Sequence, residues 1–452
     1  MAAKFLFFLF LFFSSLVQAQ VPQALAAAIR NLEADPQFKY AVISFYVEDE
    51  KGRVVFDKNS QSGLAPASCQ KVITSATGFD LLGPGYRFET AYNIKANKDT
   101  AFLEITASGD PTLGSWRWPF TKMQSVYKNI SAGLEKLKLP VTVTVMPGKF
   151  SYQPVPDGWV WQDIGNYFGA GAWHFNWHEN QYDLGLRSGN DEGSPVTIVD
   201  FQPPAAKIPL TSFISTGKKG SGDNAYIYSA PYGTSAFAMG TIPPDRDRFV
   251  ISGAMPNPSL VFINGLSEYL EKKGIEVQLA TNPSIVAGQA NTGTILSPRF
   301  DSMNYWFMKK SINLYGEAFV KAIAIYNGEI GSTEKGIALI KAHWQKKGID
   351  ADAINILDGS GLSPANRITT QALVKILQYA KQQKWFGSFE TALPVMNGIT
   401  MKDGYIGGVR SYAGYCKSAK GGLYVFSFIV NNFNGSPGTV REKMWKVLDI
   451  LK

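Results

Sequence analysis

Residues 66–71 have the sequence Pro-Ala-Ser-Cys-Gln-Lys. It opens a helix expected over residues 68–82, which the Gly-Pro-Gly sequence at 83–85 ends. Because Ser68 and Lys71 are three residues apart, nearly one helical turn, their side chains share a face. A lysine whose pKa is lowered by burial and cationic neighbours can take the serine proton. Alone the spacing is weak evidence, since a serine at a helix start is often only an N-cap.

Two downstream sequences supply groups that such a nucleophile needs. The sequence Ser-Ile-Asn at residues 311–313 offers a second hydroxyl for proton relay and an amide that can hold a substrate carbonyl. The sequence Lys-Asp-Gly at residues 402–404 opens a predicted strand, where a cation and a glycine let a ligand approach closely. Together with residues 68–71, these sequences indicate a serine hydrolase.

The first 19 residues are typical of a removable signal peptide. Lys4 precedes an apolar run over residues 5–13, and small residues stand before position 20, where signal peptidase would cut. The run is shorter than the roughly 20 residues that span a bilayer, and no later stretch is long and apolar enough. We therefore expect an exported, periplasmic protein without a transmembrane anchor.

Composition excludes several classes of protein. The formal net charge of +8 comes without a lysine or arginine run and gives no case for nucleic acid. Two cysteines, Cys69 and Cys416, are too few for a thiolate zinc site. His174 and His178 are four residues apart, but they lie in an aromatic stretch without helix signals. We expect no metal and no other cofactor. Whether the cysteines pair stays open, with two buried free thiols as the default.

The chain is too long for one core, so two or three domains are expected. Residues 20–85 and 281–452 combine strands with helices. The helices are predicted over residues 21–35, 301–326, 333–347, 369–383 and 439–451. Short glycine turns join strand-like runs at residues 400–406, 409–417 and 423–432 and make them antiparallel neighbours. Residues 86–280 consist of many short alternating segments. We predict an α+β domain interrupted by a β-rich insertion of one or two domains, with simple tandem domains as the alternative.

The three motifs resemble the active-site set of penicillin-recognising serine enzymes. More closely, the chain resembles the class C low-molecular-mass penicillin-binding proteins, the D-alanyl-D-alanine carboxypeptidase/endopeptidases of peptidase family S13. The resemblance covers nearly all residues after the signal peptide. Besides the motifs, it rests on residues 81–88, 109–113, 161–167, 310–315, 358–363, 366–369 and 408–415. It implies the penicillin-binding transpeptidase and serine β-lactamase-like fold, an antiparallel sheet flanked by helices.

The resemblance also implies catalytic roles for the motif residues. Ser68 would be the acylated nucleophile, Lys71 the general base, and Ser311 the proton relay toward the leaving group. Asn313 would contact the substrate backbone. Lys402 would interact with the Ser311 hydroxyl and with the substrate carboxylate.

Further residues are implied on the substrate side. The backbone N–H groups of Ser68 and Tyr405 would form the oxyanion hole. Asp403 and Gly404 complete the predicted substrate-binding stretch. Residues 109–113, Asp163 and residues 358–361 are expected to be structural turns without a catalytic role.

The implied activity is hydrolysis of D-alanyl-D-alanine peptides and cross-links of peptidoglycan, with β-lactams as covalent inhibitors. Two departures bear on it. Asp403 stands where the family has threonine or serine, and the segment from residue 393 to residue 402 is shorter than usual, so a loop near the active site is missing. A non-catalytic peptidoglycan- or penicillin-binding homologue and a serine β-lactamase or esterase on the same scaffold stay open. So do the stem-peptide composition, the balance of the two activities and the oligomeric state.

Overall fold

The computed structural model describes residues 20–279, 291–419 and 421–452, so the expected signal peptide lies outside the described residues. The chain forms two compact units. The first comprises residues up to 81, 304–311 and 337–452, and the second comprises residues 82–303 and 312–336. The chain passes between the units after residue 81, within α6 (Phe300–Lys309), after residue 311 and within α8 (Thr333–Lys346). In the part of the chain that is described, none of the helices has the length and apolar character needed to cross a bilayer.

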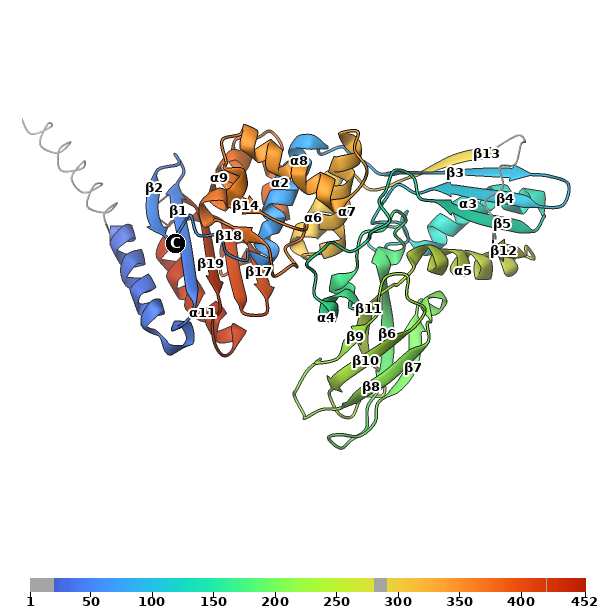
Figure 1. The fold of residues 1–452 in the computed structure, drawn as a ribbon, viewed down its shortest axis with the longest axis horizontal. Coiled ribbons are helices and arrows are strands. Elements are labelled where there is room, and N and C mark those ends of the chain that lie inside the picture. The colour runs from blue at the N-terminus through green and yellow to red at the C-terminus, as the bar shows by residue number, and fades with distance from the viewer. Residues whose placement is uncertain (1–19, 280–290, 420) are drawn as a thin grey trace, which may run out of the picture. The chain divides into compact units, whose positions relative to one another are not determined.

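The first unit is built on a six-stranded antiparallel sheet whose strands come from both ends of the chain (Figure 1). The strand order is β16-β17-β18-β19-β1-β2. In chain order the strands are β1 (Val42–Asp49), β2 (Val54–Lys58), β16 (Val395–Met396), β17 (Ile399–Ile406), β18 (Val409–Lys417) and β19 (Leu423–Asn431). β1 lies between β2 and β19, so the N-terminal hairpin extends the sheet of the C-terminal meander.

Helices cover both faces of this sheet. Phe45 and Val47 of β1 share a buried apolar cluster with the helix at residues 20–34 and with α11 (Pro437–Leu448). On the other face, the Ser44 and Thr370 hydroxyls lie 2.7 Å apart at the start of α9 (Thr370–Lys381). Successive strand residues point to opposite faces, so a strand covered on both sides is buried along its length, as β1 is. The predicted α+β fold with an antiparallel sheet flanked by helices is confirmed.

The remaining elements of the first unit position the predicted site. A 3-10 turn, η2 (Ala67–Gln70), leads directly into α2 (Lys71–Leu81), which packs on α9. The other elements are α10 (Phe386–Ala392) and the short pair β14 (Ile354–Asn355) and β15 (Arg367–Ile368). The helix expected over residues 301–326 is interrupted, because α6 ends at residue 309 and α7 (Asn313–Tyr326) begins four residues later. Ser311 lies in this break with a φ angle of 56°, which no α-helix accommodates.

The second unit contains three sheets. A five-stranded sheet consists of β3 (Glu89–Ala96), β4 (Ala101–Thr106), β5 (Val141–Met146), β12 (Val277–Leu279) and β13 (Asn291–Leu296). One three-stranded sheet is formed by β6 (Gln181–Arg187), β7 (Thr197–Gln202) and β11 (Phe249–Ala254). The other is formed by β8 (Leu210–Thr216), β9 (Tyr226–Tyr228) and β10 (Ala236–Ile242). The helices are α3 (Met123–Leu137), α4 (Trp161–Ile164), α5 (Pro258–Glu271) and α7.

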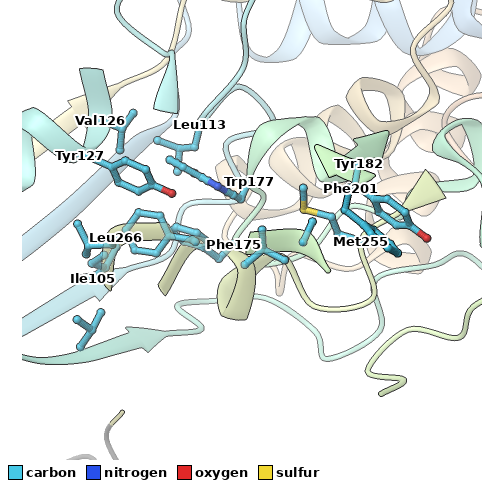
Figure 2. Packing of buried hydrophobic residues seen from close by; sticks show 14 of the residues in the cluster. Ile105, Leu113, Val126, Tyr127, Phe175, Trp177, Tyr182, Phe201, Met255 and Leu266 are labelled. Atoms are coloured by element: carbon cyan, nitrogen blue, oxygen red, sulfur yellow. The ribbon is translucent and has the colours of Figure 1, made fainter. Parts of the chain in front are cut away.

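One apolar cluster runs through the second unit and joins its sheets to α3 and α5. Figure 2 shows its centre, where Trp177 and Phe175 lie beside Tyr127. The Tyr127 and Trp177 rings are 5.2 Å apart, and Phe262 of α5 contacts the Trp177 ring at 4.8 Å. A shared core of large aromatic side chains explains why these sheets form one compact unit.

The extent of the second unit differs from the block expected at residues 86–280. β13 pairs with β3 along the edge of the five-stranded sheet, although it follows residue 280. The helix α7 also belongs to this unit. Both additions depend on partners distant in the sequence, which a local alternating pattern does not reveal.

Candidate active site

Ser68 and Lys71 are brought together by the 3-10 turn that precedes α2. Ala67 before the serine has a φ angle of 46°, a left-handed conformation that is costly for a residue with a Cβ. Lys71 Nζ donates a hydrogen bond of 2.9 Å to Ser68 Oγ. Lys71 is fully buried, whereas Ser68 is partly accessible. The arrangement places a basic group in direct contact with a hydroxyl that a substrate can reach.

A backbone carbonyl holds the lysine from the other side. Lys71 Nζ donates to the carbonyl oxygen of Ser360 at 2.7 Å, and it lies 5.8 Å from the centre of the Phe307 ring. A buried amine is strongly destabilised unless such polar partners surround it. These contacts fix the Nζ atom at the serine.

The loop that supplies this carbonyl is organised by one buried carboxylate, Asp358. Its side chain accepts hydrogen bonds from the backbone N–H groups of Gly361 and Ser363, at 2.8 and 2.7 Å. It also accepts from the side-chain amides of Gln70, at 2.8 Å, and Asn366, at 3.0 Å. Two adjacent residues therefore bind this loop: Gln70 through the Asp358 carboxylate and Lys71 through the Ser360 carbonyl.

The sequence predicts only a structural turn at residues 358–361, so the contact of the Ser360 carbonyl with Lys71 was not expected. The Asp-Gly-Ser-Gly sequence at residues 358–361, which is one of the stretches that carry the family resemblance, was the only sequence feature that pointed to this loop. A backbone acceptor carries no side-chain signature, so the sequence alone did not identify it.

The strand β17 packs directly against the Ser68 turn. The Cys69 thiol donates to the Lys402 carbonyl at 3.2 Å, and the Ser411 hydroxyl donates to the Pro66 carbonyl. Burial raises the pKa of the Cys69 thiol to about 12, so the thiol remains a donor. A Cβ on Gly404 would lie 2.8 Å from the Ser68 backbone nitrogen. Only glycine allows the strand to approach the Ser68 backbone N–H so closely.

Lys402 and Asp403 form a partly buried ion pair. Lys402 is 1% exposed and donates to the Asp403 carbonyl oxygen at 2.8 Å and to its carboxylate at 3.0 Å. Arg410 lies 3.9 Å from the same carboxylate. Burial acts to raise the pKa of Asp403, but Lys402 and Arg410 outweigh it and hold the pKa below its ordinary value. Asp403 is therefore ionised at neutral pH and neutralises the lysine beside it.

The remaining predicted residues lie on either side of the break between α6 and α7. Ser311 follows α6 in the first unit, with its left-handed backbone. Asn313 is the first residue of α7 in the second unit, and its side-chain amide donates to the Phe168 carbonyl at 2.7 Å. Tyr405 of β17 is 49% exposed, and its ring lies 5.7 Å from the Arg410 guanidinium.

The cysteines and histidines form no metal site. Cys69 and Cys416 are both free and buried, which confirms the default expectation. His178 donates through Nδ1 to the Gly114 carbonyl at 3.0 Å, so one ring nitrogen is already used. Among residues 20–279, 291–419 and 421–452, no group of three or more His, Cys, Asp or Glu side chains is placed to hold a metal ion.

Comparisons with known proteins agree with this architecture. The chain is 24% identical to a D-alanyl-D-alanine carboxypeptidase of Actinomadura sp. (strain R39), over 89% of this chain and 80% of that protein. It is 23% identical to the D-alanyl-D-alanine carboxypeptidase DacB of Haemophilus influenzae, over 87% of this chain and 85% of that protein.

A solved structure shares the fold. The crystal structure of penicillin-binding protein 4 from H. influenzae superimposes with a TM-score of 0.77, over 96% of this chain and 99% of that chain, at 20% identity. The model of the D-Ala-D-Ala carboxypeptidase 3 (S13) family matches residues 25–398, which is most of the chain. This protein therefore belongs to the D-Ala-D-Ala carboxypeptidase 3 (S13) family.

Proposed function

We propose that this protein is a serine-type D-alanyl-D-alanine carboxypeptidase/endopeptidase that acts through an acyl-enzyme on Ser68. The observation that carries the proposal is the 2.9 Å contact between a buried lysine and a serine that lies against β17. Family membership supports the same reaction. The substrates are D-alanyl-D-alanine stem peptides and D-alanyl cross-links of peptidoglycan.

The reaction proceeds in two steps. Ser68 Oγ attacks the carbonyl carbon of the scissile D-alanyl bond while the neutral amine of Lys71 takes the hydroxyl proton. The negative oxygen of the tetrahedral intermediate lies at the backbone N–H groups of Ser68 and Tyr405. The proton passes through Ser311 to the leaving amine, which departs as the acyl-enzyme forms. Water then hydrolyses the ester and restores the Ser68 hydroxyl.

The Lys402–Asp403 ion pair affects which leaving group the active site prefers. A carboxypeptidase substrate brings a free carboxylate beside Lys402, where Asp403 already neutralises the cation. A cross-linked endopeptidase substrate need not place a free carboxylate beside Lys402. We therefore propose cross-linked peptides as the better substrates. Asn313 would contact the peptide backbone in either case.

The proposal also includes the protein's location. Residues 1–19 would direct export and be removed, and the peptidase would act on peptidoglycan in the periplasm. β-Lactams would acylate Ser68, since they resemble D-alanyl-D-alanine. A related solved structure of penicillin-binding protein 4 from H. influenzae is complexed with a β-lactam, with a TM-score of 0.69 to this chain.

Labelling with a fluorescent penicillin tests the proposal. A stable label on the wild-type protein that is absent from the Ser68→Ala variant supports an acyl-enzyme. Absence of label on folded wild-type protein would contradict it and favour a non-catalytic binding protein. Rapid release of the label with hydrolysed penicillin would identify a β-lactamase instead. Digestion of purified cross-linked and uncross-linked muropeptides then measures the two activities separately.

A further inference from the structure

The second unit contains a pocket that the proposed reaction does not use. It has a volume of about 800 Å³ and lies between α4 and the sheet of β8, β9 and β10. This volume is in the range of sites that bind small molecules, about 300–1,000 Å³. All residues that line it belong to the second unit, so the pocket is complete within that unit.

Four aromatic side chains line the pocket. Phe213 and Trp161 are 66% and 48% exposed, which is unusual for side chains of this size. Tyr228 and Phe237 stack with centroids 4.8 Å apart and planes 7° from parallel, and Trp161 lies 6.0 Å from Tyr228. Exposed apolar side chains gathered in a concavity mark a binding surface. Flat rings of this kind suit a ligand with a flat apolar face.

The polar lining consists of hydroxyl groups. Thr211, Ser229, Thr234 and Ser235 contribute them, and none of the described residues that line the pocket is charged. Ser229 is 4% exposed, and its buried hydroxyl has no hydrogen-bond partner within the described residues. A buried hydroxyl without a partner costs free energy that a ligand can recover. The lining therefore fits an uncharged ligand that carries its own hydrogen-bonding groups.

We propose that this pocket binds the glycan strand of peptidoglycan. A pyranose ring has one face of C–H groups, which would stack on Phe213 or Trp161, and equatorial polar groups, which would reach Ser229. The absence of charge in the lining disfavours nucleic acid and acidic peptides. This inference rests on the proposed function, because that function brings the protein to peptidoglycan. Glycan binding would hold the enzyme on its substrate between cleavage events.

Titration calorimetry with a β-linked tetramer of N-acetylglucosamine tests the site. The full chain is used, and the probe carries no peptide, so binding does not require acylation of Ser68. We expect saturable binding that is weakened at least about fivefold by Phe213→Ala and by Ser229→Ala. Phe120→Ala is the matched control, because Phe120 is a 49% exposed phenylalanine of the same unit outside the pocket. That variant should bind as the wild type does.

Three outcomes would overturn the inference. They are the absence of saturable binding by folded wild-type protein, equal weakening by Phe120→Ala, and binding that neither pocket variant changes. Sedimentation velocity adds a fourth, because self-association that Phe213→Ala abolishes would assign the pocket to a second copy of the chain. Penicillin labelling of the same preparation reports on the proposed reaction independently, so failure of one proposal is distinguishable from failure of the other.

Discussion

Lys71 Nζ bridges Ser68 Oγ, at 2.9 Å, and the Ser360 carbonyl oxygen, at 2.7 Å. The first contact joins residues one helical turn apart, and the second joins segments 289 positions apart in the chain. The contact between Ser68 and Lys71 thus depends on a loop that only the folded unit brings to them.

Replacing the lysine tests its role as the base. Lys71→Met keeps the length and volume of the side chain but removes the proton acceptor. Loss of general-base catalysis should slow penicillin acylation by about a hundredfold to ten-thousandfold. The second-order acylation rate measures this effect, with circular dichroism as the check on folding. An acylation rate within threefold of wild type would show that another group takes the proton.

The close packing at Gly404 gives a second prediction. In Gly404→Ala, the new methyl group would lie 2.3 Å from Ser411 Oγ, 2.7 Å from the Pro66 carbonyl and 2.8 Å from the Ser68 nitrogen. The strand must then move away from Ser68, so penicillin acylation should fall by about tenfold or more, as loss of oxyanion stabilisation implies. Gly407→Ala is the control, because its Cβ would meet no atom within 4 Å. Equal acylation rates for the two variants would show that the close approach of β17 to the Ser68 backbone N–H is not needed for acylation.

Asp403 should lower activity on substrates with a free terminal carboxylate. Replacing it by threonine, as in Asp403→Thr, removes the negative charge and frees the Lys402 ammonium for the substrate. We expect kcat/KM for a D-alanyl-D-alanine peptide to rise at least about tenfold, which corresponds to about 1.4 kcal/mol. Asp403→Asn separates loss of charge from gain of a hydroxyl.

The matched substrate for this prediction is the same peptide with an amidated terminus. Its kcat/KM should change little, because it brings no carboxylate to Lys402. An equal gain on both peptides, or none on either, would argue against charge as the cause and against a preference for cross-links.

Asp110 should make the second unit sensitive to pH. It is 1% exposed, and burial raises its pKa from 3.8 to about 7, despite hydrogen bonds from Thr112. Between about pH 4 and pH 7 the folded protein keeps the proton that the unfolded chain loses. Stability from this group is therefore fully present below pH 4 and is lost as the pH rises to 7. The difference between the two pKa values corresponds to on the order of 4 kcal/mol.

Urea midpoints across this pH range measure the effect. Asp110→Asn should flatten the decline and should be more stable than the wild type at pH 8. Asp247→Asn, at an exposed position of the same unit, should leave the profile unchanged. An unchanged profile for Asp110→Asn would show that Asp110 is not the titrating group.

Local geometry made part of the site predictable. Helical spacing was sufficient to place Ser68 beside Lys71, and glycine turns were sufficient to identify the antiparallel C-terminal strands. The break at Ser311 was not expected, because apolar residues continue on both sides of it at helical spacing. The ion pair of Lys402 with Asp403 is not evident from the sequence, since adjacent residues of a strand normally point to opposite faces.

The position of β1 between β2 and β19 sets an order for folding. Val42 pairs with Asn431, so the central part of the sheet forms only after almost the whole chain has been made. Until then, β1 presents an unpaired apolar edge, which is a template for aggregation. Residues 82–303 contain the three sheets of the second unit and the apolar cluster that joins them. None of these sheets includes a strand from the C-terminal part of the chain. The strands of the second unit are therefore all made before β16 to β19 of the first unit, and a chain that ends before residue 423 keeps the Ser68 motif but lacks β19, the strand that joins β18 to β1.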